Sequence, residues 1–363
     1  MRKDVIAKQP GMRTKYPQRH LRNSEGVMQC RWGASLSWGC FAIMLLLASC
    51  ERQPQKMVLQ GLAQGSYYAI TYYDAEGRDF QAEVDSIFHA VDLSVNLWVD
   101  SSVICKVNRN EDVVLDNIFI DNFNIAQKAA ELSGGYFDPT IAPLVEAWGF
   151  GAGNGQRTTE NGELIDSLRV LVNYRNIHIE DGKVVKADPA MRLDFNAIAQ
   201  GYTSDMMGAF LESKGVTSYI VDVGGEIMAR GCKPDGKPWV VGIEKPAADW
   251  DSERVIQQRV ELSDKGIVTS GSYRKYVERD GKRYSHSIDP TTGYPVDHQL
   301  LSATVIAETS VWADALASIC MVMGMERSLE IINSWDGVEA YYIFVNDQGN
   351  LDTYATSGFN LLD

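Results

Sequence analysis

The order of strand-like and helix-like segments most constrains what this chain can fold into. Residues 65–73 combine aromatic and β-branched side chains, which favours a strand. Apolar residues recur with helical spacing over residues 79–98. A second helix over about 120–133 is expected to end at Gly134-Gly135. Short strands dominate the second half without regular strand–helix–strand alternation, so we predict an α+β fold of mixed or antiparallel sheets with packed helices.

The rest of the chain continues this mixture without internal repeats. No clear linker divides it, so one domain is expected. The other predicted elements are helices over residues 160–172, 198–213, 311–323 and 326–334, a hairpin over 177–185 turning at Asp181-Gly182, and strands over 218–223, 239–243, 259–262, 266–270, 302–307 and 340–345.

The amino-terminal segment over residues 1–49 is predicted to lie outside the fold. Its apolar run begins near Phe41, after Arg31, and is too short to span a bilayer. These features are typical of a secretory signal peptide. A start at Met28 would give a signal of ordinary length.

The end of that run, Leu47-Ala-Ser-Cys50, resembles the lipobox of bacterial lipoproteins. In such proteins the cysteine becomes the lipidated first residue of the mature chain. Residues 50–57 would then be the lipidated Cys50 and a short polar tether, followed by the folded domain over residues 58–363. We therefore expect a bacterial membrane-anchored lipoprotein that faces the periplasm. The alternative is a plain signal peptide with a chance cysteine.

The net charge argues against nucleic acid as a partner. The chain carries −14 at pH 7, and its first fifty residues contribute +6 from eight Lys or Arg and two acids, so the rest carries −20. Affinity for nucleic acid comes largely from neutralising phosphates. An anionic ligand of this chain would need a metal ion or a local group of N–H donors.

Three cysteines remain once the leader and Cys50 are set aside. Cys105, Cys232 and Cys320 are far apart, odd in number, and form no Cys-x-x-Cys pair. A disulfide framework or a zinc site is therefore not expected. We interpret them as buried free thiols.

Three short motifs are candidates for ligand contact. Asp138 follows a helix stop, and its alternative role is to cap a short helix with Pro139 at the first position. Residues 193–202 bring small side chains to a helix entry, where backbone N–H groups could approach a phosphate. Residues 222–226 place two glycines after a strand, and could form only a turn.

A fourth motif pairs Asp314 with Ser318. One helical turn separates them, so their oxygens lie on one helix face. A carboxylate and a hydroxyl can complete a Mg²⁺ site beside substrate phosphates, because Mg²⁺ takes few protein oxygens and keeps other ligands. The alternative is a solvated helix face. That helix is apolar nearly all round, so a buried Asp314 would need a partner.

A fifth motif surrounds His286. It precedes an elaborate turn in which Asp289, Pro290 and Gly293 are all turn-forming residues. From the residues alone, His286 is either structural or a group that the turn holds against a ligand. His286 and Ile288 are predicted to lie on one strand, where their two-residue spacing would point both side chains to the same face. A histidine can accept a hydroxyl proton near neutral pH.

In this order, the motifs resemble one family, the FAD:protein FMN transferases or ApbE-type flavin transferases, which are often exported lipoproteins. The resemblance runs from about residue 58 to the C-terminus. It rests on Gly65-Ser66, Asn96–Trp98 with Ser102 and Asn108, Gly135–Thr140, Trp148–Gly151, Asp194–Gly201, Val223–Gly225, Gly242–Pro246, Thr269–Gly271, His286–Gly293 and Ala313–Ser318.

The resemblance implies an ApbE-like fold and an enzyme that binds FAD and a divalent cation, usually Mg²⁺. Such enzymes transfer FMN from FAD, through a phosphoester bond, to a Thr or Ser hydroxyl of a target protein and release AMP. A subunit of a membrane-bound redox complex is the expected target. Carried over by position, the site comprises His286 as the catalytic residue, flavin contacts at Gln64, Trp98, Tyr136, Phe137, Asp138, Gln200 and Ile288, and metal ligands at the Ala197 carbonyl, Asp314 and Ser318.

Three residues depart from the family's pattern. Gln200 stands where the family commonly has Lys, which removes a positive charge near the pyrophosphate. Ser318 replaces the usual Thr, keeping the oxygen but losing the stiffer β-branched rotamer. Gln64 stands where Met is frequent. These changes bear on affinity more than on the class of activity.

Two other functions use the same residues. One is hydrolysis of FAD to FMN and AMP, which sequence cannot separate from transfer. The other is a non-catalytic flavin-binding lipoprotein. His286, Asp314 and Ser318 are needed only for chemistry, so their joint presence favours an enzyme.

Overall fold

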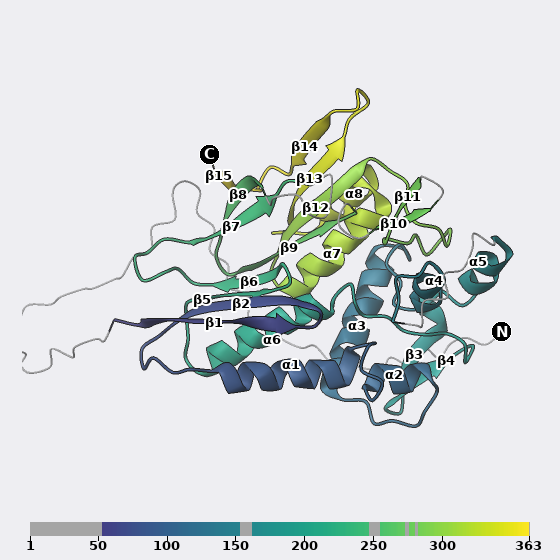
Figure 1. The fold of residues 1–363 in the computed structure, drawn as a ribbon, viewed down its shortest axis with the longest axis horizontal. Helices are drawn as coiled ribbons and strands as arrows, with labels where there is room; N and C mark the ends of the chain where they lie inside the picture. The colour runs from purple at the N-terminus through teal and green to yellow at the C-terminus, as the bar shows by residue number, and fades with distance from the viewer. Residues whose placement is uncertain (1–52, 153–161, 247–254, 273–275, 280–281, 363) are drawn as a thin grey trace, which may run out of the picture. The chain divides into compact units, whose positions relative to one another are not determined.

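The computed structural model describes residues 53–152, 162–246, 255–272, 276–279 and 282–362 (Figure 1). These residues form helices packed on antiparallel sheets, which confirms the predicted α+β class. The predicted signal peptide and Cys50 lie outside the described residues. No helix in the described ranges has the length and apolar character needed to cross a membrane.

An eight-stranded sheet is central to the described part, and each neighbouring pair of its strands is antiparallel. In spatial order its strands are β1 (Gln55–Ala63), β2 (Ser66–Asp74), β5 (Tyr219–Val223), β6 (Glu226–Arg230), β9 (Lys265–Gly271), β12 (Leu300–Ala307), β13 (Glu339–Val345) and β14 (Leu351–Ala355).

A smaller sheet and two hairpins complete the described strands. The three-stranded sheet consists of β15 (Leu361–Leu362), β8 (Ile256–Leu262) and β7 (Trp239–Glu244). The hairpins are β3 (Ile177–Glu180) with β4 (Lys183–Lys186), and β10 (Tyr276–Arg279) with β11 (Lys282–Ser285).

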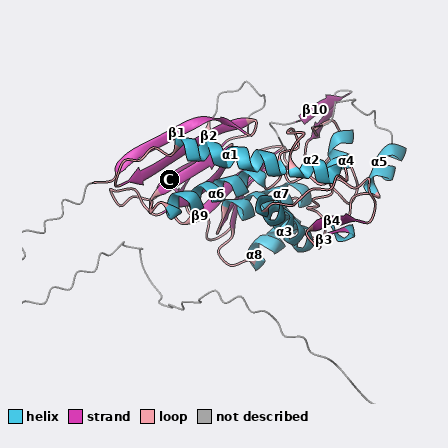
Figure 2. Cartoon of the chain, turned by 90° about the horizontal axis from the view of Figure 1, so that it is seen from below, coloured by secondary structure: helices cyan, strands magenta, loops and turns pink. Residues whose placement is uncertain are grey.

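Some of the helices cover one face of the eight-stranded sheet. Figure 2 shows α1 and α6 lying along the strands, and α7 packs on β9 and β12. The described helices are α1 (Gln81–Val95), α2 (Val103–Asn108), α3 (Asn117–Leu132), α4 (Ala142–Ala147), α5 (Gly162–Arg169), α6 (Ala199–Ser213), α7 (Ser310–Met323) and α8 (Met325–Ser334).

Alternation along the strands divides the core between the two faces of this sheet. Val268 packs in the cluster that contains α3, α7 and α8, whereas the adjacent Ile267 packs against the three-stranded sheet. Met228 likewise joins the α1 and α6 side, while Ile227 and Ala229 point to the other. Successive strand residues point to opposite faces, so the middle residues of β6 and β9 are buried on both faces of the sheet.

Most predicted elements are present, and the main omission is β1. It begins at Gln55, so the domain boundary predicted at residue 58 lies inside this strand and the predicted polar tether overlaps it. β1 is an edge strand in which polar Gln55, Lys56 and Gln60 and apolar Val58 and Leu62 are all exposed, so it shows no regular apolar pattern to recognise. The strands β6, β10, β11, β14 and β15 and the six-residue helices α2 and α4 are also not predicted from the sequence.

The cysteines partly match expectation. None of the three forms a disulfide, but only Cys320 is buried, whereas Cys105 and Cys232 are half-buried. Cys320 lies 3.4 Å from the hydroxyl of Tyr342, and burial raises the pKa of its thiol to about 11. This thiol therefore behaves as a packed core group rather than a reactive one.

Candidate active site

Asp314, one of the predicted metal ligands, lies where α6 begins against α7. Gly201, in the first turn of α6, donates its backbone N–H to the Asp314 carboxylate at 3.2 Å. A Cβ at Gly201 would lie 2.8 Å from both the Ser310 carbonyl oxygen and the Val311 Cα. Only glycine therefore allows the two helices this close approach. The sequence pattern around Gly201 has a packing function here, and it places Asp314 beside the helix entry.

Asp314 is a buried acid in an unfavourable electrostatic setting. Its side chain is 5% exposed. Burial raises its pKa well above the usual value, and the negative charges of Glu226 and Asp205 raise it further, opposed by the Gly201 N–H. A bound cation would remove this penalty, because an opposite charge favours the ionised carboxylate.

The other two predicted ligands lie on the elements that carry this contact. Ser318 is half-buried and one turn after Asp314 on α7, and Ala197 is half-buried two residues before α6 begins. A carboxylate, a hydroxyl and a carbonyl are hard oxygen donors of the kind Mg²⁺ prefers. The residues present therefore fit such an ion. Among the described residues, no group of three or more His, Cys, Asp or Glu side chains forms an alternative metal site.

Gln64 lies in the two-residue turn between β1 and β2. Gln64 and Gly65 have φ of 50° and 72°, which is typical of a type I′ hairpin turn. A left-handed backbone is uncommon for glutamine. The Gln64 amide donates to the hydroxyl of Thr203 on α6 at 3.1 Å, while its carbonyl oxygen is buried without a hydrogen-bond partner in the structure. The turn is thus fixed against the α6 entry.

Gln200 meets a second hairpin turn at the same place. Gly224 and Gly225 join β5 to β6 with φ of 72° and 112°. The glycine motif at residues 222–226 is therefore a hairpin turn, which was its alternative interpretation. A Cβ at Gly224 would lie 2.7 Å from the Gln200 side-chain nitrogen and 3.2 Å from the Ser66 hydroxyl. Two sheet turns and one helix entry therefore converge, and they bring Gln64, Gln200 and Asp314 into one neighbourhood.

Asp138 has a different role from the predicted helix cap. Helix α4 begins at Ala142, and its N-cap is Ile141. Asp138 instead accepts from the backbone N–H and the hydroxyl of Thr140 at 2.8 and 2.6 Å, and from the Tyr174 N–H at 2.8 Å. Burial raises its pKa, opposed by these hydrogen bonds. It therefore fixes the loop after α3 rather than a helix end.

The other two predicted flavin contacts in this loop differ in environment. The Phe137 side chain is buried in the largest apolar cluster, at 7% exposed. Tyr136 accepts a hydrogen bond from the Arg327 guanidinium at 2.8 Å, and the guanidinium lies 5.5 Å from the ring centroid. Helix α8 therefore holds the Tyr136 ring in place through Arg327.

A short extended segment connects this loop to the α6 entry. The Asp194 N–H donates to the Pro139 carbonyl at 2.8 Å. One residue earlier, Leu193 exchanges two hydrogen bonds with the Asn108 side chain, at 2.7 and 2.9 Å. The segment leading to Ala197 is therefore held by the Asp138 loop and by α2. Burial raises the pKa of the Asp194 carboxyl to about 6.

Trp98 lies in the loop between α1 and α2 and is 63% exposed. Its backbone N–H is fixed by the Asn96 side chain at 2.8 Å. An exposed indole on a fixed backbone can provide a stacking surface.

The turn after His286 docks on the α4 region. The Trp148 indole donates to the Gly293 carbonyl at 2.8 Å, and Gly293 has a φ of 81° that suits glycine. Asp289 accepts from the Thr291 N–H at 2.8 Å, which closes the turn. Ile288 is 5% exposed in a cluster with Leu144, Trp148 and Ile165, so its side chain is largely occupied by packing.

The prediction that His286 and Ile288 lie on one strand is wrong. Strand β11 ends at Ser285, His286 lies in a bend, and Ile288 forms only an isolated bridge with Pro295. Proline cannot extend a ladder, which limits the pairing there. His286 is half-buried, with its ring 6.3 Å from the Phe150 ring in an edge-on arrangement.

Three contacts of this region were not predicted. Asp205 accepts hydrogen bonds from the first N–H groups of α7, Thr203 binds the Gln64 amide, and Arg327 binds Tyr136. Asp205 carries a detectable signal, because it is an acid four residues after Gly201 in a largely apolar helix. The other two depend on long-range packing and leave no local pattern.

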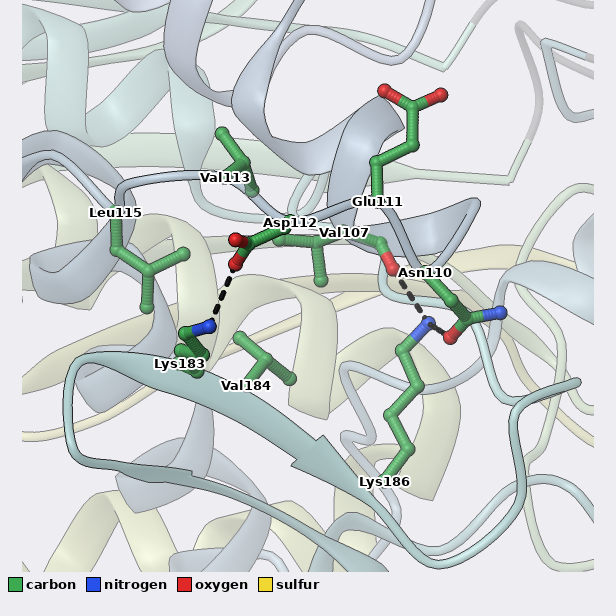
Figure 3. Close-up of a pocket in the computed structure, with 9 residues that line it drawn as sticks. All are labelled: Val107, Asn110, Glu111, Asp112, Val113, Leu115, Lys183, Val184 and Lys186. Carbon is green, nitrogen blue, oxygen red and sulfur yellow. Dashed lines mark hydrogen bonds and ion pairs between the residues drawn. The ribbon is translucent and has the colours of Figure 1, made fainter.

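A cavity of about 290 Å³ lies elsewhere, between the end of α2 and the β3–β4 hairpin (Figure 3). None of its lining residues is a predicted site residue. The Lys186 ammonium donates to the Val107 carbonyl at 2.7 Å and to Asn110 at 3.0 Å, so it caps the carboxyl end of α2. Burial lowers its pKa to about 8. We interpret this region as a structural brace.

Comparisons with known proteins agree with one another. A family model described as the ApbE family matches residues 64–342. A FAD:protein FMN transferase of Vibrio cholerae is 33% identical over 88% of this chain and 96% of its own length, and one of Haemophilus influenzae is 32% identical over 88% and 95%.

Solved structures give the same result for the fold. The flavin transferase ApbE from Vibrio cholerae has a TM-score of 0.75 and 31% identity, covering 84% of this chain and 98% of that one. The apo flavinyl transferase ApbE of Pseudomonas stutzeri has a TM-score of 0.74 and 33% identity, with 84% and 96% covered. The predicted ApbE-like fold is therefore confirmed.

Proposed function

The chain belongs to the ApbE family and is a transferase, and from this premise we propose that it moves FMN from FAD to a Thr or Ser hydroxyl of another protein, with release of AMP. The observation that carries the proposal is the α6–α7 contact. It places a buried carboxylate, Asp314, beside the helix entry, where Gln200 lies against the Gly224 turn and Thr203 binds the Gln64 turn. This is a place where a pyrophosphate and its counterion could lie together.

The ion would be held by the Ala197 carbonyl, the Asp314 carboxylate and the Ser318 hydroxyl. When bound, Mg²⁺ would supply the positive charge that a pyrophosphate needs beside an acidic protein. Gly201 and Asp205 fix the relative positions of the two helices that carry these ligands. Phosphoryl transfer depends mainly on such positioning and charge neutralisation.

His286 is proposed as the general base. It would take the proton of the acceptor hydroxyl while that oxygen bonds to the FMN phosphorus and the bond to AMP breaks. The docked turn from Asp289 to Gly293 fixes the backbone that follows His286. Trp98, Tyr136, Asp138, Gln64 and Ile288 are proposed to surround the flavin nucleotide.

The test is to mix the purified protein with FAD, Mg²⁺ and a Thr- or Ser-bearing domain of a membrane redox-complex subunit. Intact mass spectrometry should show FMN added to the acceptor, with AMP detected by chromatography in equal amount. Chelation by EDTA and the Asp314→Ala variant should each abolish both signals. Full activity of Asp314→Ala at sub-millimolar Mg²⁺ would remove Asp314 from the metal site.

The same experiment separates the two alternatives. Free FMN and AMP without any labelled acceptor would indicate FAD pyrophosphatase activity. Bound FAD that stays intact would indicate a non-catalytic flavin-binding protein.

We further propose that the protein is anchored in a bacterial membrane through lipid on Cys50 and faces the periplasm. The lipobox supports this, as does the start of the described fold soon after Cys50. A periplasm-facing anchor would place the enzyme beside a membrane redox subunit that carries the acceptor hydroxyl.

A further inference from the structure

The start of α7 is capped by a side chain from another helix. The first four N–H groups of a helix lack partners within it. In α7 the Ser310 N–H donates to Asp205 Oδ1 at 2.8 Å, and the Val311 N–H donates to Asp205 Oδ2 at 2.9 Å. Both carboxylate oxygens of Asp205, a residue of α6, therefore accept hydrogen bonds from α7. The N-cap Thr309 adds a longer bond, at 3.4 Å to Trp312.

A second contact lies one turn away on α6. Gly201 precedes Asp205 by four residues, so both are on one face of that helix. Gly201 approaches Ser310 and Val311 closely and donates its N–H to Asp314. Two fixed points, one turn apart, determine how far α7 lies from α6 and how it is rotated about its own axis.

That rotation matters because the proposed metal ligands are divided between the two helices. Ala197 leads into α6, whereas Asp314 and Ser318 belong to α7. A small turn of α7 would move both of its oxygens away from the Ala197 carbonyl. Mg²⁺ demands near-ideal octahedral geometry and is less tolerant of such displacement than larger ions.

We propose that Asp205 is a positioning residue for this metal cradle: by binding the first two N–H groups of α7, it holds Asp314 and Ser318 in register with Ala197. The inference rests on the proposed function, since it assumes that these three residues bind the ion. Partners of metal ligands that fix their orientation typically change metal affinity by about 10–100-fold when they are removed.

The first test uses Asp205→Asn with Asp116→Asn as the matched control. Asp116 also caps a helix, accepting from the Phe119 N–H of α3 at 2.8 Å. Asp205→Asn replaces one of two acceptor oxygens with an amide NH2 group, and Asp116→Asn removes a negative charge at the start of α3, so both should lower the unfolding midpoint in urea. Flavin fluorescence quenching at fixed FAD then gives the Mg²⁺ concentration for half-maximal binding.

We expect Asp205→Asn to raise this Mg²⁺ concentration about 10–100-fold, with FAD affinity restored at saturating Mg²⁺. Asp116→Asn should leave it unchanged. An Asp205→Asn variant that loses stability but keeps the wild-type Mg²⁺ dependence would overturn the proposal and make Asp205 a purely structural cap.

A second variant, Asp205→Glu, distinguishes the effect of the carboxylate's position from the effect of its charge. It also provides the test if Asp205→Asn does not fold. It keeps the negative charge but moves the carboxylate by one methylene. A shifted Mg²⁺ dependence in this variant supports positioning, whereas a wild-type dependence contradicts it. If wild-type protein binds FAD equally well with and without Mg²⁺, the metal assignment itself is refuted. The wild-type titration alone reveals this outcome, so it is distinguished from a failure of the Asp205 proposal.

Discussion

The contact between α6 and α7 gives the sharpest stability prediction, for Gly201→Ala. Helix propensity alone favours this change by about 1 kcal/mol, because alanine restricts the unfolded chain and suits a helix interior. The contact opposes it. The new Cβ would lie 2.8 Å from the Ser310 carbonyl oxygen and the Val311 Cα and 2.9 Å from the Asp314 Cβ, whereas ordinary contact begins at 3.4 Å.

The helices would therefore have to separate by about 0.6 Å, the difference between 3.4 and 2.8 Å. Two of the three opposing atoms are backbone and cannot rotate away. Overpacking of this kind costs about 1–3 kcal/mol. The separation also stretches the 3.2 Å bond from Gly201 to Asp314, and a typical hydrogen bond contributes about 0.5–1.5 kcal/mol. We expect a net loss of about 1–3 kcal/mol in the free energy of unfolding.

Equilibrium urea denaturation measures this loss, and Ser213→Ala is the control. Ser213 is exposed near the end of the same helix, so alanine should raise stability there by no more than about 0.5 kcal/mol. Gly201→Ala should also weaken Mg²⁺-dependent FAD binding. A Gly201→Ala protein that is more stable than wild type by about 1 kcal/mol would refute the close-contact argument.

Three further predictions follow from the site and the termini. His286→Ala should lower kcat by about 10²–10⁴-fold with little change in the Kd for FAD; equal losses in binding and turnover would indicate a phosphate contact instead. Asp194→Asn should leave stability unchanged at pH 3 but raise it by up to about 3 kcal/mol at pH 7.5. The pKa of Asp194 is raised to about 6 in the fold, so wild-type stability is lost as pH rises from about 4 through 6. Urea midpoints that change with pH identically in both proteins would contradict this. Cys50→Ser should release active enzyme from the membrane fraction, and a variant that stays in the pellet would place the anchor elsewhere.

The sequence by itself determined the fold class, most elements and the family. Helical spacing, turn residues and the order of motifs are local properties, so they can be recognised without coordinates. The hairpin turn at Asp181-Gly182 is an example, because both residues adopt the positive φ that such a turn requires. The pairing of Asp314 with Ser318 on one face of α7 could likewise be predicted from their spacing.

Edge and loop features were harder to predict from local pattern. β1 is an edge strand with many exposed residues, and its first three residues, 55–57, fall in the predicted tether because its apolar pattern is weak. The two-residue spacing predicts that His286 and Ile288 share a strand. The chain instead bends at His286, and Ile288 pairs only with Pro295, which cannot extend the ladder. Local pattern allows Asp138 to be a helix N-cap. In the structure it instead accepts a hydrogen bond from Tyr174, which is distant in sequence.

Only the tertiary structure decided how the site is assembled. Gln64, Gln200 and Asp314 are far apart along the chain, and two sheet turns and the α6 entry bring them together. Asp205 gained its role through hydrogen bonds to residues more than a hundred positions away. Local sequence specifies backbone dihedral angles and periodicity. The distance between two helices instead depends on the size of the side chains at their contact, and at Gly201 the absence of a side chain allows α6 and α7 to approach closely.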